Sequence, residues 1–210
     1  MYKVIAGLFS VIVIIFAVTT ISNQLVSGED SLKVEKYQEL TSHVKFVKIY
    51  EDFKEIELDS KLVVIGKKIG SEPVFIKDDS GETAIYYTLS DFSVEKVLKN
   101  ETGNEVKKKS EITIMENAAI DEVNKISYSV EGYKLMKDNK RYILFLTPNR
   151  TEEGVYNAVG VVHGKYAFEK NKSARDEQFD KDTENYEDEL KNVNKKVYSE
   201  IEEKYKVELN

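Results

Sequence analysis

The chain has no cysteine among its 210 residues, no tryptophan and only two prolines. The absence of thiols excludes cysteine nucleophiles, disulfides, cysteine-ligated zinc and a lipid-modified N-terminal cysteine, so the core alone must hold the fold. Basic residues are outnumbered by acidic ones: 31 Lys and Arg against 38 Asp and Glu give a net charge of −7. That balance disfavours binding to nucleic acid, whose phosphates require a basic surface.

Histidine is equally scarce. Of the two histidines, His43 precedes the predicted domain, and His163 lies in VVHGKY beside a predicted turn. A serine–histidine triad or a histidine-bound metal needs partners that neither segment supplies, and no Gly-x-Ser-x-Gly motif is present. Acidic residues are too abundant for spacing to single out a catalytic pair. We therefore predict no catalytic residue, no metal site and no cofactor, although catalysis by carboxylates alone is left open.

One long apolar run dominates the N-terminus. Val4 to Ile21 carries no charge and would span about 27 Å as a helix, close to the hydrocarbon core of a bilayer. Because Lys3 precedes it, the positive-inside rule places the rest of the chain outside the cytoplasm. We predict a membrane anchor in residues 1–22; the alternative is a signal peptide that is cleaved near Gly28, which would release the protein.

A polar spacer is predicted over residues 23–49, followed by a domain over residues 50–170. The domain opens with a short helix near Glu51–Leu58, and KLVVIGKKI then forms a strand that ends at Gly70. KDDSGE has the composition of a turn. Later strands are predicted in EITIMEN, in RYILFLTP and in the segment around Gly160 and Gly164, with a long connection before RYILFLTP.

The most informative segment is the strand from Glu82 to Leu98. Its apolar residues keep one parity from Ile85 to Leu89, whereas Phe92 and Val94 have the other. The pattern predicts that the inward face switches at Ser90–Asp91, through a bulge or a sharp bend. Long bent strands of this kind serve both halves of a small closed barrel. The fold class is therefore mainly β with flanking helices, built on a five- to six-stranded barrel.

Residues 171–210 are rich in charge. Apolar residues recur within them at spacings of three and four, which predicts an amphipathic helix: Tyr186, Leu190, Val193, Val197, Ile201 and Tyr205. We expect this stripe to pack on the chain's own domain. Self-association through the helix is the alternative.

Four segments, in this order, resemble a family of extracytoplasmic bacterial proteins of unknown function: DSKLVVIGKKIG, YTLSDFSVEKVLKN, EGYKLMKDNKRYILFL and VVHGKYAF. The resemblance covers about residues 50–170. The composition of the chain also resembles that of extracytoplasmic proteins of Gram-positive bacteria. The resemblance of the four segments implies an OB-like barrel of the TIMP/netrin type. The chain departs from the family pattern at Asn100, where glycine is usual, and at Asp138–Lys140, where Gly-Lys is usual. The resemblance supplies no catalytic residue.

Tyrosine is abundant, with thirteen in the chain. OB barrels often bind ligands on one sheet face, where aromatic rings can stack on bases or sugars. A ligand face is therefore predicted from five residues: Tyr86, Tyr128, Tyr133, Tyr156 and His163. The alternative is that these are ordinary half-buried residues of the barrel.

Together these features predict a non-enzymatic binding module on the outside of the cell membrane, with an envelope protein or a wall component as its partner. A hydrolase that uses surface carboxylates and an inhibitor-like module are the two alternatives.

Overall fold

The computed structural model describes residues 37–45, 48 and 50–209. The predicted anchor, residues 1–22, and the predicted cleavage site near Gly28 lie outside the described residues. Among the residues that are described, no helix is long and apolar enough to cross a membrane.

The chain is mainly β, as predicted, and its strands form two sheets. The larger sheet contains six strands: β2 (Leu62–Lys77), β3 (Thr83–Asn100), β4 (Glu111–Glu116), β7 (Arg141–Pro148), β8 (Val155–Ala158) and β9 (Lys165–Ala167). Their order is β2-β3-β4-β8-β7-β9, and β2 also pairs with β7. This extra pairing closes five of the strands into a ring, in which β4 and β8 run parallel and the other neighbours run antiparallel.

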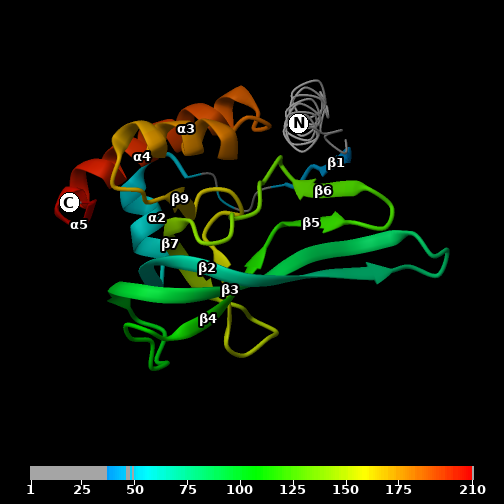
Figure 1. Ribbon diagram of the computed structural model, residues 1–210, viewed down its shortest axis with the longest axis horizontal. Coiled ribbons are helices and arrows are strands. Elements are labelled where there is room, and N and C mark those ends of the chain that lie inside the picture. The colour runs from blue at the N-terminus through cyan, green and yellow to red at the C-terminus, as the bar shows by residue number, and fades with distance from the viewer. Residues whose placement is uncertain (1–36, 46–47, 49, 210) are drawn as a thin grey trace, which may run out of the picture. The chain divides into compact units, whose positions relative to one another are not determined.

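The smaller sheet was not predicted. It contains β1 (Gln38–Ser42), β6 (Ile126–Val130) and β5 (Ala118–Asp121), in that order. β1 lies within the predicted spacer 23–49, and its five residues are all exposed, so no alternation of apolar and polar residues marks it as a strand. β5 and β6 lie within the stretch that was predicted to be a connection. In Figure 1 the three strands lie above the outer halves of β2 and β3.

β2 is longer than predicted. It continues through Gly70 to Lys77 and pairs with β3 along its whole length. The predicted turn KDDSGE is confirmed, because Asp78 Oδ1 accepts hydrogen bonds from the backbone amides of Ser80 and Glu82 at 2.9 and 3.1 Å. The outer halves of the two strands, residues 70–77 and 83–91, are called the ribbon below. The ribbon extends beyond β7 and β4 (Figure 1).

β3 keeps its phase at Ser90–Asp91, and the irregularity at this point lies in its partner strand β2. In β3 the residues Thr88, Ser90, Phe92 and Val94 share one parity and are all buried, so the predicted switch at Ser90–Asp91 is wrong. The extra residue is Ile69 in β2, because Lys68 pairs with Phe92 and Gly70 pairs with Asp91. This bulge reverses which residues of β2 face inward.

Two apolar layers fill the molecule. One lies inside the ring of strands: Leu62, Val64, Phe92, Val94, Ile112, Ile114, Met136, Tyr142, Leu144, Leu146, Tyr156 and Ala167. The other lies between the outer face of β2 and β7 and the helices. It includes Val63, Ile65, Ile143 and Phe145 on the strands. The alternation along β2 and β7 is what lets each strand serve both layers.

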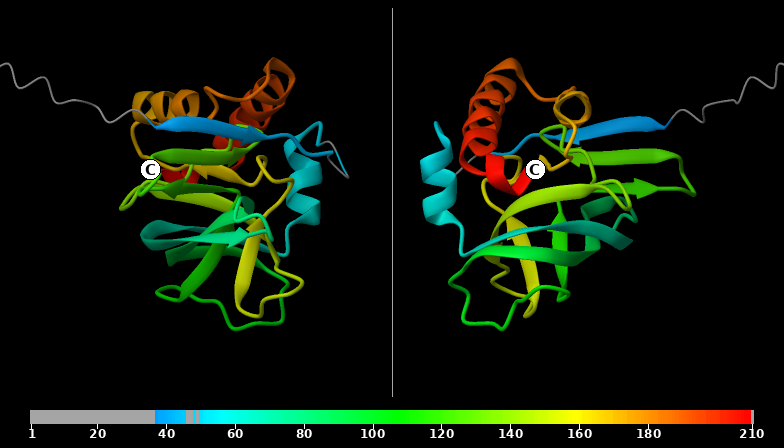
Figure 2. Two further views of the ribbon diagram at one scale, coloured as in Figure 1. Left: turned by 90° about the vertical axis from the view of Figure 1, so that its right-hand side faces the viewer. Right: turned by 60° about the vertical axis from the view of Figure 1, so that its left-hand side comes forward.

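Helices cover the second layer. They are α2 (Phe53–Asp59), α3 (Lys172–Asp182), α4 (Asp188–Lys204) and the short α5 (Lys206–Leu209). Figure 2 shows α2, α3 and α4 grouped at one end of the strands. The predicted stripe is confirmed as a packing face, since Val197 and Ile201 of α4 are buried against this layer together with Tyr205. Self-association through α4 remains a prediction, and it would have to use the charged face.

Candidate ligand-binding cleft

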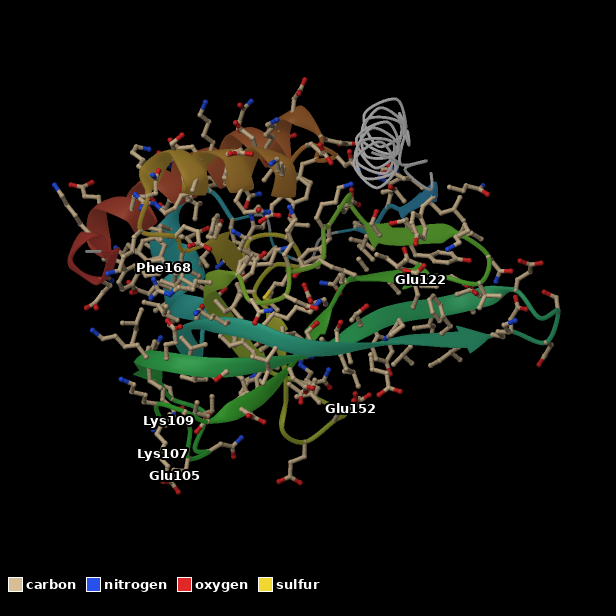
Figure 3. All side chains as sticks on the ribbon, viewed as in Figure 1. Glu105, Lys107, Lys109, Glu122, Glu152 and Phe168 are labelled. Atoms are coloured by element: carbon tan, nitrogen blue, oxygen red, sulfur yellow. The ribbon has the colours of Figure 1, made fainter. Side chains whose placement is uncertain are left out.

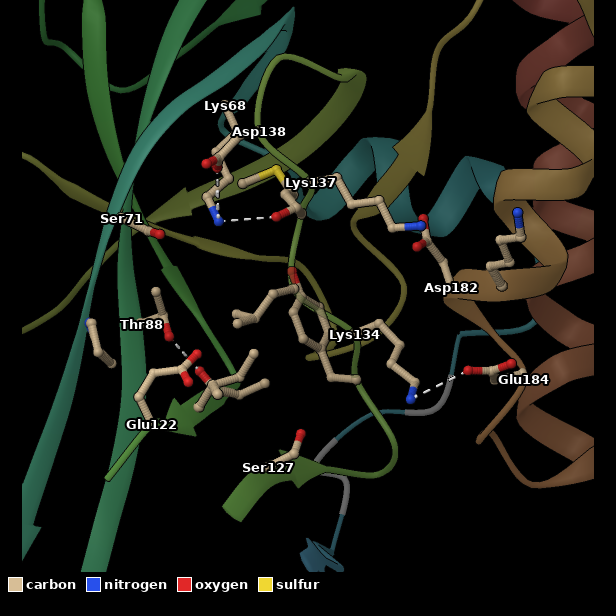
Figure 4. Close-up of a pocket in the computed structure, with 17 residues that line it drawn as sticks. Lys68, Ser71, Thr88, Glu122, Ser127, Lys134, Lys137, Asp138, Asp182 and Glu184 are labelled. Atoms are coloured by element: carbon tan, nitrogen blue, oxygen red, sulfur yellow. Dashed lines mark hydrogen bonds and ion pairs between the residues drawn. The ribbon is translucent and has the colours of Figure 1, made fainter. Parts of the chain in front are cut away.

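An open cleft of about 890 Å³ is bounded by the ribbon, the small sheet and two further segments. The ribbon lines one side through Ser71, Pro73 and Thr88, and the small sheet and its flanking turn line another through Ala118, Ile120, Glu122 and Ser127. The third side is the segment 133–138, which joins β6 to β7, and the end is closed by Lys181 and Asp182 of α3 and by Glu184 just after it. Figure 4 shows these side chains converging on a shared space.

Glu116 fixes the third side of the cleft. It is the last residue of β4 and follows Ile112 and Ile114 at the same inward parity, so the strand buries its carboxylate to 1% exposure. The carboxylate accepts hydrogen bonds from Ser90 Oγ at 2.5 Å, Tyr133 OH at 3.0 Å and the amide of Met136 at 2.7 Å. These three donors compensate its burial. Glu116 therefore ties the wall segment to strand β3.

Lys68 stands at the inner end of the cleft. Its side chain is only 5% exposed, because the β2 register directs it inward opposite Phe92. The ammonium donates to the carbonyl oxygen of Met136 at 2.9 Å and lies 3.5 Å from a carboxylate oxygen of Asp138, whose side chain is 65% exposed (Figure 4). The deepest charge in the cleft is thus a cation whose carboxylate partner is a surface residue.

Two further buried charges lie near the cleft. Lys165 donates to the carbonyl oxygen of Lys134, and its ammonium lies 4.0 Å from the centre of the Tyr133 ring. Burial lowers the pKa of Lys165, an effect that the charges of Asp182 and Glu116 oppose. Burial also raises the pKa of Asp182, against the effects of Lys165 and of a 2.7 Å hydrogen bond from Gln178. Lys165 and Asp182 thus attract each other across the base of α3.

The rim of the cleft carries balanced charge. Lys134 lies 3.3 Å from Glu184 and 3.6 Å from Glu39, and Lys137 donates to Gln178 at 3.3 Å. The two Lys134 ion pairs are exposed or half-exposed and contribute little to stability. The basic loop between β3 and β4 is remote from the cleft: Figure 3 shows Lys107 and Lys109 projecting from the opposite end of the strands, as expected of a solvated turn.

The five predicted ligand residues do not form one face. The rings of Tyr86 and Tyr128 lie with their centres 4.9 Å apart and are tilted by 35°, but Tyr86 OH donates internally to the carbonyl oxygen of Ser129 at 2.8 Å. Tyr133 is 2% exposed and lines the cleft only as part of its wall. Tyr156 is 3% exposed and belongs to the layer inside the ring. Tyr86 and Tyr128 are half-buried, and a ligand-binding role for these tyrosines stays a prediction.

His163 is 1% exposed and packs against the ring of Tyr50, with ring centres 5.6 Å apart. Burial lowers its pKa to about 4, although a hydrogen bond with Asn194 acts in the opposite direction. It lines a second cavity of about 380 Å³, shared with His43 and Glu131. His43 Nδ1 lies 3.2 Å from Glu131 Oε2. In the described part of the chain, no three His, Asp or Glu residues are grouped as a metal would require.

The sequence analysis missed Lys68 and Glu116, although both leave a signal. Each continues the inward parity of its strand, where a charge is unexpected: Leu62, Val64 and Gly66 precede Lys68, and Ile112 and Ile114 precede Glu116. A charge at a core position is paired, or else marks a site. Asp182, by contrast, lies in a stretch so rich in charge that nothing in the sequence distinguishes it.

The chain was compared with protein families, with curated proteins and with solved structures. No family model matches it, and no curated protein or solved structure matches it either.

Proposed function

We propose that the chain is a non-enzymatic binding module that an N-terminal apolar anchor holds on the outer side of the cell membrane. The N-terminal part of this proposal rests on the sequence alone, through the uncharged run Val4–Ile21 and the preceding Lys3. The binding role rests on the folded domain. An envelope protein or a wall component would be the biological source of its ligand.

The scaffold is proposed to be an OB-like barrel. In support, five strands close in the order β2-β3-β4-β8-β7, and β4 and β8 are the one parallel pair in that ring. Barrels of this type serve as supports for ligand sites in proteins of many unrelated functions. The analogy concerns the scaffold, and it identifies no ligand.

The observation that carries the proposal is the cleft beside the ribbon. It combines apolar walls, through Ile120, Leu135 and Met136, with a few polar groups, which is the usual composition of a small-molecule site. The buried carboxylate that lines it, Asp182, accepts from Gln178, and Glu116 behind the wall accepts from three donors. The cleft is thus better suited to holding a molecule than to transferring protons.

A variant that fills the cleft tests this role. Ser127 lines it from β6, so Ser127→Phe should occupy the space and abolish the thermal stabilisation that cleft ligands give to the full-length protein. Thr113→Phe is the matched control, because Thr113 lies between the inward residues Ile112 and Ile114 and so points outward from β4. The screen should cover peptides, glycans, esters and phosphates. A ligand that stabilises the Thr113 variant and not the Ser127 variant supports the proposal.

Catalytic turnover would overturn the proposal of a non-enzymatic binding module. If one of the screened compounds is consumed with saturable kinetics, and if Asp138→Asn or Asp182→Asn abolishes that reaction, the protein is an enzyme of the carboxylate class.

The membrane proposal has a separate test. In cells stripped of their wall, we expect the protein to stay with the membrane fraction and to be degraded by added protease, because the domain would lie outside. Replacing two residues of the apolar run, Ile12→Lys and Ile14→Lys, should abolish membrane retention, since each buried charge costs about 3 kcal/mol in a bilayer. Recovery of most of the wild-type protein from the medium, with Glu29 as its first residue, would contradict the anchor and favour cleavage.

A further inference from the structure

We propose that the cleft binds an amphipathic carboxylate, with Lys68 and Ser71 holding the carboxylate where β2 bulges. The apolar part of the ligand would lie against Ile120, Leu135 and Met136. This inference rests on the proposed function, because it names the ligand class of the same cleft.

The bulge at Ile69 brings the two polar residues together. Residues three apart in a regular strand point to opposite faces, since side chains alternate. Lys68 and Ser71 instead share a face, because Ile69 is the extra residue between the paired positions Lys68 and Gly70. Both line the cleft, and Figure 4 shows them projecting from β2 toward the segment 133–138. Bulges re-aim side chains in this way beside functional sites.

The charge at this point favours an anion. The Lys68 side chain is 5% exposed, and burying an ammonium is costly unless a counter-charge accompanies it. Its carboxylate partner, Asp138, is 3.5 Å away on the surface, which is longer than a strong charged hydrogen bond of about 2.8 Å. An entering carboxylate can replace Asp138 on Lys68. Asp138 would then return to solvent at little cost, because its side chain is already 65% exposed.

Ser71 adds a second donor. Among the described residues, no hydrogen bond to its hydroxyl is found, in contrast to Thr88, which donates to the carbonyl oxygen of Ala118 at 2.7 Å. A carboxylate has two oxygens, so one can accept from Lys68 and the other from Ser71. The apolar walls then select a carboxylate that is attached to an apolar group.

Two kinds of ligand have a carboxylate attached to an apolar group: a short fatty acid and the C-terminus of an apolar peptide. The probes are therefore hexanoate and N-acetyl-Leu-Leu, each compared with its uncharged amide. Binding to the full-length protein in phosphatidylcholine nanodiscs is followed through the methyl resonance of Met136, which lines the cleft. At least one acid should bind, and its amide should bind about tenfold or more weakly, as expected for a lost charged hydrogen bond. The acid that binds more tightly identifies the source.

Two variants move the affinity in opposite directions. Lys68→Met should weaken binding of the acid by about 10- to 100-fold, whereas Asp138→Asn should tighten it, because the competing carboxylate is gone. Lys67→Met is the control with the same change in charge. Lys67 does not line the cleft; it lies near Glu95, at 3.7 Å. The gain in the Asp138 variant cannot arise from a folding defect, so the test holds even if the Lys68 variant unfolds.

The outcomes separate this inference from the proposed function. Equal affinity for acids and amides, or no change in the Asp138 variant, would overturn the carboxylate site while leaving an apolar cleft. If neither acid binds but another screened compound stabilises the protein in a way that Ser127→Phe abolishes, the binding module stands and the carboxylate inference falls. If no compound is sensitive to Ser127→Phe, both fall.

Discussion

Ending the chain at Lys170 is expected to unfold the protein rather than merely to weaken it. The deletion removes α3, α4 and α5, and with them five buried side chains of the outer apolar layer: Phe179, Val197, Tyr198, Ile201 and Tyr205. At about 1.5–3 kcal/mol for each large side chain, the loss is comparable to the entire stability of an ordinary domain, about 5–15 kcal/mol. Circular dichroism and urea titration of the shortened chain measure it.

A point variant tests the same packing without a deletion. Ile201 is 2% exposed, so Ile201→Ala should lower the free energy of unfolding by about 2–5 kcal/mol through lost burial and a cavity. Asn192→Ala on the exposed face of α4 should change it by less than about 0.5 kcal/mol. A folded chain that ends at Lys170, or equal effects of the two substitutions, would show that α4 does not stabilise the barrel.

Replacing Glu116 by alanine should be the most damaging single change near the cleft. The substitution removes a buried carboxylate and leaves three donors, on Ser90, Tyr133 and Met136, without their acceptor. Since stranded buried donors and charged hydrogen bonds each cost about 1–3 kcal/mol, we expect a loss of about 3–5 kcal/mol in the free energy of unfolding. Chemical denaturation measures the loss, and amide hydrogen exchange at Met136 should rise in parallel.

Glu111→Ala is the matched control, because Glu111 begins the same strand and is exposed. It should be nearly neutral. If the two variants had equal stability, or if exchange at Met136 stayed slow in Glu116→Ala, Glu116 would not be what holds the wall of the cleft.

The parts of the fold that follow periodicity were predictable. The strands β4 and β7 and the stripe of α4 were expected from the sequence, because half-buried elements repeat their apolar residues at the period of the backbone. The small sheet was not, since β1 is exposed along its whole length and β6 is only half-buried. Such strands are specified by their partners and not by their own pattern.

The candidate site was predicted poorly for a related reason. The tyrosines were chosen because aromatic rings can stack on bases or sugars. Tyr133 and Tyr156 are instead buried in apolar clusters whose other members come from distant segments of the chain. Lys68 and Glu116 carry a local signal, a charge in phase with core residues, that could have been used. The bulge at Ile69 could be placed only by the ladder, because β3 is regular opposite it and has its extra residues elsewhere, among them Glu95 and Leu98.

That bulge makes Ile69 a residue whose presence matters more than its identity. Its side chain is 46% exposed, so many substitutions there should be tolerated. Losing the residue altogether is a different event. A deletion would shift the register of the outer half of β2, turning Ser71 and Pro73 toward solvent and Glu72 and Val74 toward the small sheet. Genetic variation at this position should therefore permit exchange but not insertion or deletion, whereas an exposed loop residue usually tolerates both.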